Sequence, residues 1–388
     1  MSMFSQTGPI RDTDILYWSR RFLLLSGLWP ESHNDFRLSI YLGYLIPFTS
    51  LIYISALKHM HDRDKLLRNM TEFIPTTMAV LRAVMFRRKM YLLVPIIKTV
   101  RENASEGYFK TPDERKVVHW YYMISNLFIK ISVIMLYCVN VMLYLKPMIE
   151  YAFSKHRNTS FSYEMPYQIS FIHEVTEMRT YILAYVYQSP IPVVFSIGIM
   201  AADSLLVTLV LYVCGQLSVL RIQIKNVSSD SRSHKSEMKS LIEKHEKLIR
   251  MAKSVENAFS SFLFVQMFCL TLCICVVAYQ LLTMINSGDP TNAFTFTIFA
   301  LSVVLVTFSY CFLGECLIYE STSLNEAYYD SKWYELPAKL ARPIAICMAR
   351  SQIPVHLTAG KFYVFSLDLF VNVIKASMGY LSVLIKVT

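Results

Sequence analysis

The sequence predicts an all-α integral membrane protein with seven transmembrane helices. Hydrophobic residues make up 54% of its 388 residues and charged residues only 17%, whereas a soluble domain carries about a quarter charged residues. The apolar residues gather in blocks of roughly 20 or more, the length that a helix needs to cross a bilayer core about 30 Å thick. Soluble cores are built from shorter, more interrupted elements, so the composition excludes a soluble fold.

Seven apolar blocks follow one another along the chain, and the second is the weakest because Arg82 interrupts it. The third block contains Lys130, the fourth contains Asp203, and the last contains Asp368 and Lys375. Hydropathy blocks of this kind identify transmembrane helices. The predicted spans are residues 38–57, 73–86, 117–145, 180–220, 258–285, 293–313 and 362–385.

Basic residues predict the orientation of the chain in the membrane. The N-terminus and the connections 87–117, 221–253 and 332–350 contain 25 Lys and Arg, and the alternate connections with the C-terminus contain nine. Because Lys and Arg collect on the cytoplasmic side, we expect a cytoplasmic N-terminus and an extracellular C-terminus. This topology also explains the net charge of +10 without a nucleic-acid partner.

That orientation is opposite to the one found in G-protein-coupled receptors, the other large seven-helix class. All eight cysteines lie in predicted spans or predicted cytoplasmic segments, so none is placed where an oxidising compartment would permit an extracellular disulfide. The Asp-Arg-Tyr and Asn-Pro-x-x-Tyr signatures of that class are absent from the sequence.

The sequence contains no motif that indicates an enzyme, a metal site or a cofactor. We find no His-Glu-x-x-His, no Gly-x-Ser-x-Gly and no phosphate-binding loop. Cys269, Cys273 and Cys275 lie on an uncharged apolar helix without a nearby His. We therefore interpret these cysteines as small buried hydrophobes.

We expect one membrane domain, residues 1–388, with two helical segments on its cytoplasmic side. In the first segment, 228–257, apolar residues from Met238 onward recur at helical spacing on one face. In the second segment, 335–353, Pro337 and Pro354 bracket the amphipathic stretch 338–353. Two such segments provide material for a cytoplasmic anchor between subunits.

The C-terminal third carries an ordered set of motifs. They are Tyr310-Cys311, Gly314-Glu315, Glu320-Ser321, Ala327-Tyr328, Trp333, Arg350-Ser351-Gln352, Pro354, Gly360-Lys361-Phe362, Ser366-Leu367, Phe370, Lys375, Ser377, Tyr380 and Leu384. This order, over roughly eighty residues, resembles the signature of the sixth and seventh spans of insect odorant receptors and is more specific than any single short motif. The N-terminal half matches the family in span pattern only.

The short connection after the fourth span resembles that of an odorant-binding (tuning) subunit, because the family's co-receptor has a long insertion there. The sister family of gustatory receptors typically carries a Thr-Tyr pair and a final Gln-Phe in its last span, and this chain lacks them. The segment from Gly360 to Phe370 is nevertheless unusually similar to the co-receptor.

The resemblance implies an odorant-gated, non-selective cation channel subunit and no enzyme. Tuning subunits assemble with co-receptor subunits as a heterotetramer around one pore, in the plasma membrane of insect olfactory sensory neurons. The last span, residues 360–388, would line that pore, with the gate at Val383, Lys386 and Val387. A G-protein-coupled or gustatory-type chemoreceptor is the alternative.

The resemblance also implies a ligand pocket among the second to sixth spans, in the outer half of the membrane. Small volatile molecules offer mainly apolar area, so their site should be aromatic and mostly dry, with a few polar groups. The same residues could instead serve interhelical packing. The candidate ligand-binding residues are Thr76, Thr77, Tyr137, Asn140, Tyr144, Tyr185, Gln188, Phe195, Tyr279, Phe296 and Thr297.

Four charged residues, Arg82, Lys130, Asp203 and Glu315, project to the inner half of the bilayer in the predicted topology. Charges there are expensive and must be paired or face water. They could form part of an ion path, but we favour structural pairing of Asp203 with Arg82 or Lys130.

Four Asn-x-Ser/Thr sequons test the topology, because only lumenal asparagines receive glycan. With the N-terminus in the cytoplasm, Asn69 and Asn158 are the predicted glycosylation sites, and Asn103 and Asn226 face the cytoplasm.

Overall fold

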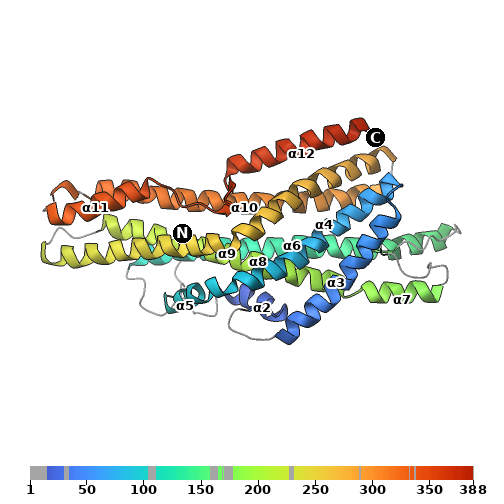
Figure 1. The fold of residues 1–388 in the computed structure, drawn as a ribbon, viewed down its shortest axis with the longest axis horizontal. Helices are drawn as coiled ribbons and strands as arrows, with labels where there is room; N and C mark the ends of the chain where they lie inside the picture. The colour runs from blue at the N-terminus through green and yellow to red at the C-terminus, as the bar shows by residue number, and fades with distance from the viewer. Residues whose placement is uncertain are drawn as a thin grey trace.

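Long helices make up almost the whole structure (Figure 1). The computed structural model describes residues 15–29, 35–103, 111–157, 165–167, 169, 178–226, 231–287, 290–331, 333–335 and 338–387. The α-helices are α2 (Tyr17–Leu25), α3 (Asp35–Lys58), α4 (Arg63–Lys89), α5 (Val94–Asn103), α6 (Pro112–Arg157), α7 (Met178–Gln188), α8 (Ile191–Lys225), α9 (Ser231–Ser287), α10 (Pro290–Asp330), α11 (Ala338–Ser351) and α12 (Leu367–Val387). The short elements are the 3-10 turns η1 (Met90–Leu92) and η2 (Trp333–Glu335) and an antiparallel pair of strands, β1 (Thr358–Ala359) and β2 (Tyr363–Val364).

Five helical stretches in the described part of the chain are long and apolar enough to cross a membrane. They are Phe36–Lys58, Pro112–Leu145, Met178–Lys225, Ser236–Ile285 and Ala293–Asp330. The third stretch combines α7 and α8, which are separated at Pro190. α4 packs against α3, α8 and α9, and α12 packs against α9 and α10. The prediction of an all-α membrane protein is confirmed. α4 and α12 lie at the second and last of the seven predicted spans but are not among these five stretches.

α9 and α10 extend beyond the thickness of a bilayer core. They contain 57 and 41 residues, which correspond to about 85 and 60 Å of helix. At the end of the molecule opposite α7, they lie beside α11 (Figure 1), and the Tyr328 hydroxyl of α10 lies 3.2 Å from His245 Nδ1 of α9. The predicted segments 228–257 and 335–353 fall mainly in α9 and α11. Their role as an anchor between subunits stays a prediction.

α8 is the buried axis of the bundle. Every residue from Met200 to Leu220 is buried, because α2, α6, α9 and α10 all pack against this helix. On the α2 side, the Ser19 hydroxyl lies 3.2 Å from that of Thr208. A helix that is apolar on every side is expected to occupy such an interior position.

The start of α12 is fixed by close contact with α10. The Glu315 carboxylate accepts a hydrogen bond of 3.1 Å from the Leu367 backbone N–H, which satisfies one of the unpaired donors at a helix N-terminus. One residue earlier, the backbone at Gly314 approaches the Phe365 carbonyl so closely that an added Cβ would lie 2.2 Å from its oxygen. Glu315 therefore orients the last helix and is not part of a buried ion pair in the described structure.

We expect Gly314→Ala to destabilise the protein, because its methyl group would push the start of α12 away from α10. Overpacking of this kind typically costs about 1–3 kcal/mol. The measurement is the midpoint of thermal unfolding of the purified protein in detergent, which should fall. Gly379→Ala in α12 is the control, because no atom lies within 4 Å of its added Cβ. Equal midpoints for the two variants would contradict the described contact.

Candidate functional site

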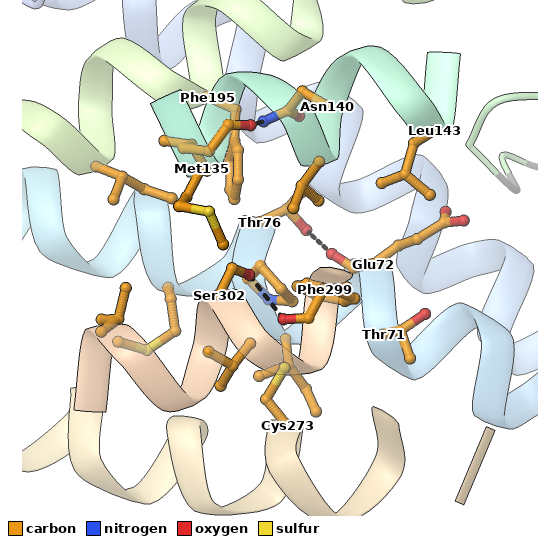
Figure 2. A pocket seen from close by; sticks show the side chains of 18 of the residues that line it. Thr71, Glu72, Thr76, Met135, Asn140, Leu143, Phe195, Cys273, Phe299 and Ser302 are labelled. Carbon is orange, nitrogen blue, oxygen red and sulfur yellow. Dashed lines mark hydrogen bonds between the residues drawn. The ribbon is translucent and has the colours of Figure 1, made fainter. Parts of the chain in front are cut away.

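A cavity of about 760 Å³ lies inside the bundle, between α4, α6, α8, α9 and α10. Small-molecule sites have volumes of roughly 300–1,000 Å³, so this cavity has the size of a ligand site. Figure 2 shows side chains of three helices directed toward one another across it, among them Thr76 of α4, Met135 of α6 and Ser302 of α10.

Aromatic and methionine side chains line the cavity on several sides. Phenylalanine rings come from α6, α8 and α10, and thioethers lie between them. Methionine is flexible and polarisable, so such a wall can adapt to ligands of different outline. The wall residues of these two kinds are Phe128, Phe195, Phe296, Phe299, Phe308, Met78, Met135, Met165 and Met200.

Three hydroxyl groups in the wall donate their protons to their own helices. Thr76, Ser302 and Ser309 hydrogen-bond to backbone carbonyls one turn earlier, at 2.8, 2.7 and 2.7 Å. Their oxygens remain as acceptors, but their donors are already used. These positions therefore make the cavity only weakly polar.

A short segment around Tyr167 closes one side of the cavity through amide side chains. The Tyr167 hydroxyl donates to Asn140 Oδ1 at 3.1 Å. Gln188 Oε1 accepts from the Tyr167 backbone N–H at 3.0 Å, and its Nε2 donates to the Tyr167 carbonyl at 3.3 Å. Asn140 and Gln188 thus hold the segment that contributes Met165 and Pro166 to the wall.

A ring of charged and polar groups contributes Arg82, Asp203 and Gln266 to the lining. Arg82 Nη1 lies 3.1 Å from Asp203 Oδ2, Arg82 Nη2 donates to the Tyr310 hydroxyl at 2.8 Å, and Tyr310 donates to Asp203 Oδ1 at 2.7 Å. Arg82 Nε also donates to Gln266 Oε1 at 3.0 Å. The predicted pairing of Asp203 with Arg82 is confirmed, whereas Lys130 is exposed on the surface of α6.

Four of the predicted pocket residues, Thr76, Asn140, Phe195 and Phe296, line the cavity. By contrast, the Tyr137 side chain is 66% exposed. Residues three and four apart share a helix face, but the sequence does not show which way that face turns. On α6 the face of Asn140 turns inward, and Tyr137 lies at its outer edge.

The other predicted pocket residues are outside the lining. The Tyr144 hydroxyl donates to the Tyr185 carbonyl at 3.2 Å, and the Tyr185 hydroxyl donates to the Tyr144 carbonyl, so these residues join α6 to α7. Gln188 lies behind the wall, where it holds Tyr167. The remaining members that do not line the cavity are Thr77, Tyr279 and the exposed Thr297.

Sequence reasoning missed Gln266 and the segment around Tyr167. Gln266 is an amide in a span without charged residues, which was an available signal for a buried polar contact. The segment around Tyr167 falls in a connection between spans, where no periodicity indicates burial.

None of the predicted gate and glycosylation residues that the structure describes belongs to the cavity lining. Val383 is 59% exposed and Lys386 is also exposed at the end of α12, while the side chain of Val387 lies outside the described residues. The Asn69 side chain is fully buried in α4 and donates to the Ser55 hydroxyl at 3.4 Å, so a glycan at Asn69 is incompatible with this packing. Asn158 lies outside the described residues.

Comparisons with known proteins relate most of the chain to one family. The family model described as 7tm Odorant receptor matches residues 63–378. Odorant receptor 13a of Drosophila melanogaster is 26% identical over 94% of this chain and 93% of its own length. The Odorant receptor coreceptor of Ooceraea biroi is 30% identical, but over only 39% of this chain and 31% of its own length.

A solved structure has the same fold. The insect olfactory receptor OR5 from Machilis hrabei, in complex with eugenol, superposes with a TM-score of 0.83, covers 97% of this chain and 100% of its own, and is 17% identical. A second structure of the same receptor superposes with a TM-score of 0.78. The family match begins in α4, well before the motifs of the C-terminal third, and sets aside an enzyme and a G-protein-coupled receptor. The chain belongs to the 7tm odorant receptor family.

Proposed function

We propose that this protein is the odorant-binding (tuning) subunit of an odorant-gated, non-selective cation channel. In this proposal it binds a small volatile molecule in the cavity and assembles with co-receptor subunits as a heterotetramer. The complex resides in the plasma membrane of olfactory sensory neurons, and α12 lines the shared pore.

The cavity is the observation that carries the proposal. Its aromatic and thioether wall suits a small apolar molecule, whose binding free energy comes mainly from the removal of apolar surface from water. It also lies within a bundle that matches a receptor described in complex with eugenol. The nearly full-length similarity to Odorant receptor 13a, together with the short connection between α8 and α9, favours a tuning subunit over a co-receptor.

The exposed face of α12 supports its role in the pore. Asn372, Lys375, Ser382 and Lys386 are exposed, and their spacing places them along one side of the helix. Polar and charged side chains within a membrane face a protein interior or a water-filled path. With a cytoplasmic N-terminus, as the distribution of basic residues favours, the end of α12 at Val383 and Lys386 would form the extracellular gate.

The direct test is the response to volatile ligands with and without a co-receptor. We expect odorant-evoked cation currents when the chain is expressed with a co-receptor, and little or no current from either chain alone. Whole-cell recording against a panel of volatiles measures both. Strong currents from the chain alone would refute the partnership, and the absence of any odorant response in the pair would refute the proposed function.

Two aromatic substitutions test whether the ligand binds in the cavity or beside the exposed Tyr137. Phe195→Ala removes part of the cavity wall, and a buried aromatic side chain contributes about 1.5–3 kcal/mol. We therefore expect the half-maximal odorant concentration to rise by roughly 10- to 100-fold. Tyr137→Ala should leave it unchanged, because Tyr137 points away from the cavity. Dose–response curves in which both variants behave alike would place the ligand elsewhere.

Lys386 provides a test of the proposed pore. A fixed positive charge beside a cation path repels divalent ions more than monovalent ones, because the Coulomb energy scales with the charge of the ion. We expect Lys386→Gln to raise calcium permeability relative to sodium in the heteromeric channel, without a change in odorant selectivity. Reversal potentials in calcium-rich and sodium-rich solutions measure the ratio. Identical potentials would mean that Lys386 extends to the lipid headgroups instead.

A further inference from the structure

In one part of the cavity lining, Gln266 lies beside a ring of charged and polar groups that are bonded to one another. In the ring, Arg82, Asp203 and Tyr310 bond to one another, and both carboxylate oxygens of Asp203 accept a hydrogen bond. The charges are therefore compensated before any ligand arrives. A ring of this kind offers no free charge that would select an ionic ligand.

Gln266 contacts both this ring and the cavity. Its side chain is 6% exposed, and the residue belongs to the cavity lining. Arg82 Nε donates to its Oε1 at 3.0 Å. An arginine nitrogen can only donate, so the amide oxygen must face Arg82, and the orientation of the amide is fixed by chemistry. The Nε2 group then lies on the other side of the amide, with two protons to donate.

The Nε2 group of Gln266 has no hydrogen bond to any residue in the described part of the chain. Leaving a donor unpaired in an apolar surrounding costs free energy, whereas supplying an acceptor recovers it. The wall hydroxyls of Thr76, Ser302 and Ser309 have already donated to their own helices, and Asn140 Nδ2 donates to the Leu136 carbonyl at 2.7 Å. Gln266 thus provides a donor that these neighbouring groups do not.

We propose that Gln266 orients the ligand by donating from Nε2 to an acceptor oxygen on an otherwise apolar volatile molecule. The ligand class is a ketone, aldehyde or ester, whose carbonyl oxygen accepts without bringing a donor of its own. The inference rests on the proposed function and adds the chemical class of its ligand. Arg82 acts through Gln266 as a positioning residue, because it holds the amide oxygen away from the ligand.

The experiment uses the full chain expressed with a co-receptor. The probes are straight-chain ketones, aldehydes and methyl esters, each paired with the alkane that has the same number of non-hydrogen atoms. The measured quantity is the ratio of half-maximal concentrations within each pair, which cancels differences in expression. In the parent channel we expect the carbonyl compound to act at a concentration about 10- to 100-fold lower than the alkane.

Gln266→Met keeps the length of the side chain and removes the donor, so the ratio should collapse toward one. Gln266→Glu retains an oxygen for Arg82 and also lacks the amide donor, so it should lose the preference even if the Met variant fails to reach the membrane. Gln280→Leu is the control, because Gln280 is buried on the same helix, at 3% exposure, and does not line the cavity. It should keep the parental ratio.

The outcomes separate this inference from the proposed function. If the parent channel responds to alkanes as well as to their carbonyl partners, or if either Gln266 variant keeps the parental ratio, the role of Gln266 is refuted and the channel assignment stands. If no volatile in the panel evokes a current, the proposed function fails and this inference falls with it.

Discussion

The buried guanidinium of Arg82 is the constraint on which the arrangement of the membrane helices depends. A cation inside an apolar bundle is tolerated only when its charge and its hydrogen bonds are satisfied. Arg82 of α4 meets this requirement through Asp203 of α8, Tyr310 of α10 and Gln266 of α9. Removing one partner of a buried ion pair typically costs about 3–5 kcal/mol. The four helices are therefore held in one relative position by directional bonds, whereas apolar packing alone is non-directional.

The cavity lies between two such sets of directional bonds. One is the ring around Arg82, and the other joins Asn140 and Gln188 to Tyr167. Phenylalanine and methionine side chains form much of the remaining wall. The packing of this wall can change at small cost in free energy, because thioethers are flexible. The site thus combines fixed polar ends with an adaptable apolar wall, an arrangement suited to ligands that share a length and a functional group more than an outline.

The sequence was sufficient to predict the membrane helices and an ion pair for Asp203, because both follow from local rules, but it left Arg82 and Lys130 open as the partner. A block of apolar residues has to form a helix in lipid, and a buried Arg82 has to find an acid. The pocket was only partly predictable, because the direction in which Tyr137 or Asn140 points depends on how each helix rotates against its neighbours. The sequon at Asn69 carries no information on burial either, because it is only a three-residue motif, and that side chain is fully buried.

The unbroken course of α9 gives the receptor a mechanical property. This helix holds Gln266 at the cavity, packs against α12, and continues to His245, which lies beside Tyr328. A rigid rod amplifies rotation with distance. About 30 residues separate Gln266 from Met238, or roughly 40 Å of helix, so a tilt of about 2° at the cavity displaces the far end by roughly 1.5 Å, more than a typical tolerance of side-chain packing. α9 therefore connects the cavity rigidly to the far end of the molecule, where it packs against α10 and α11.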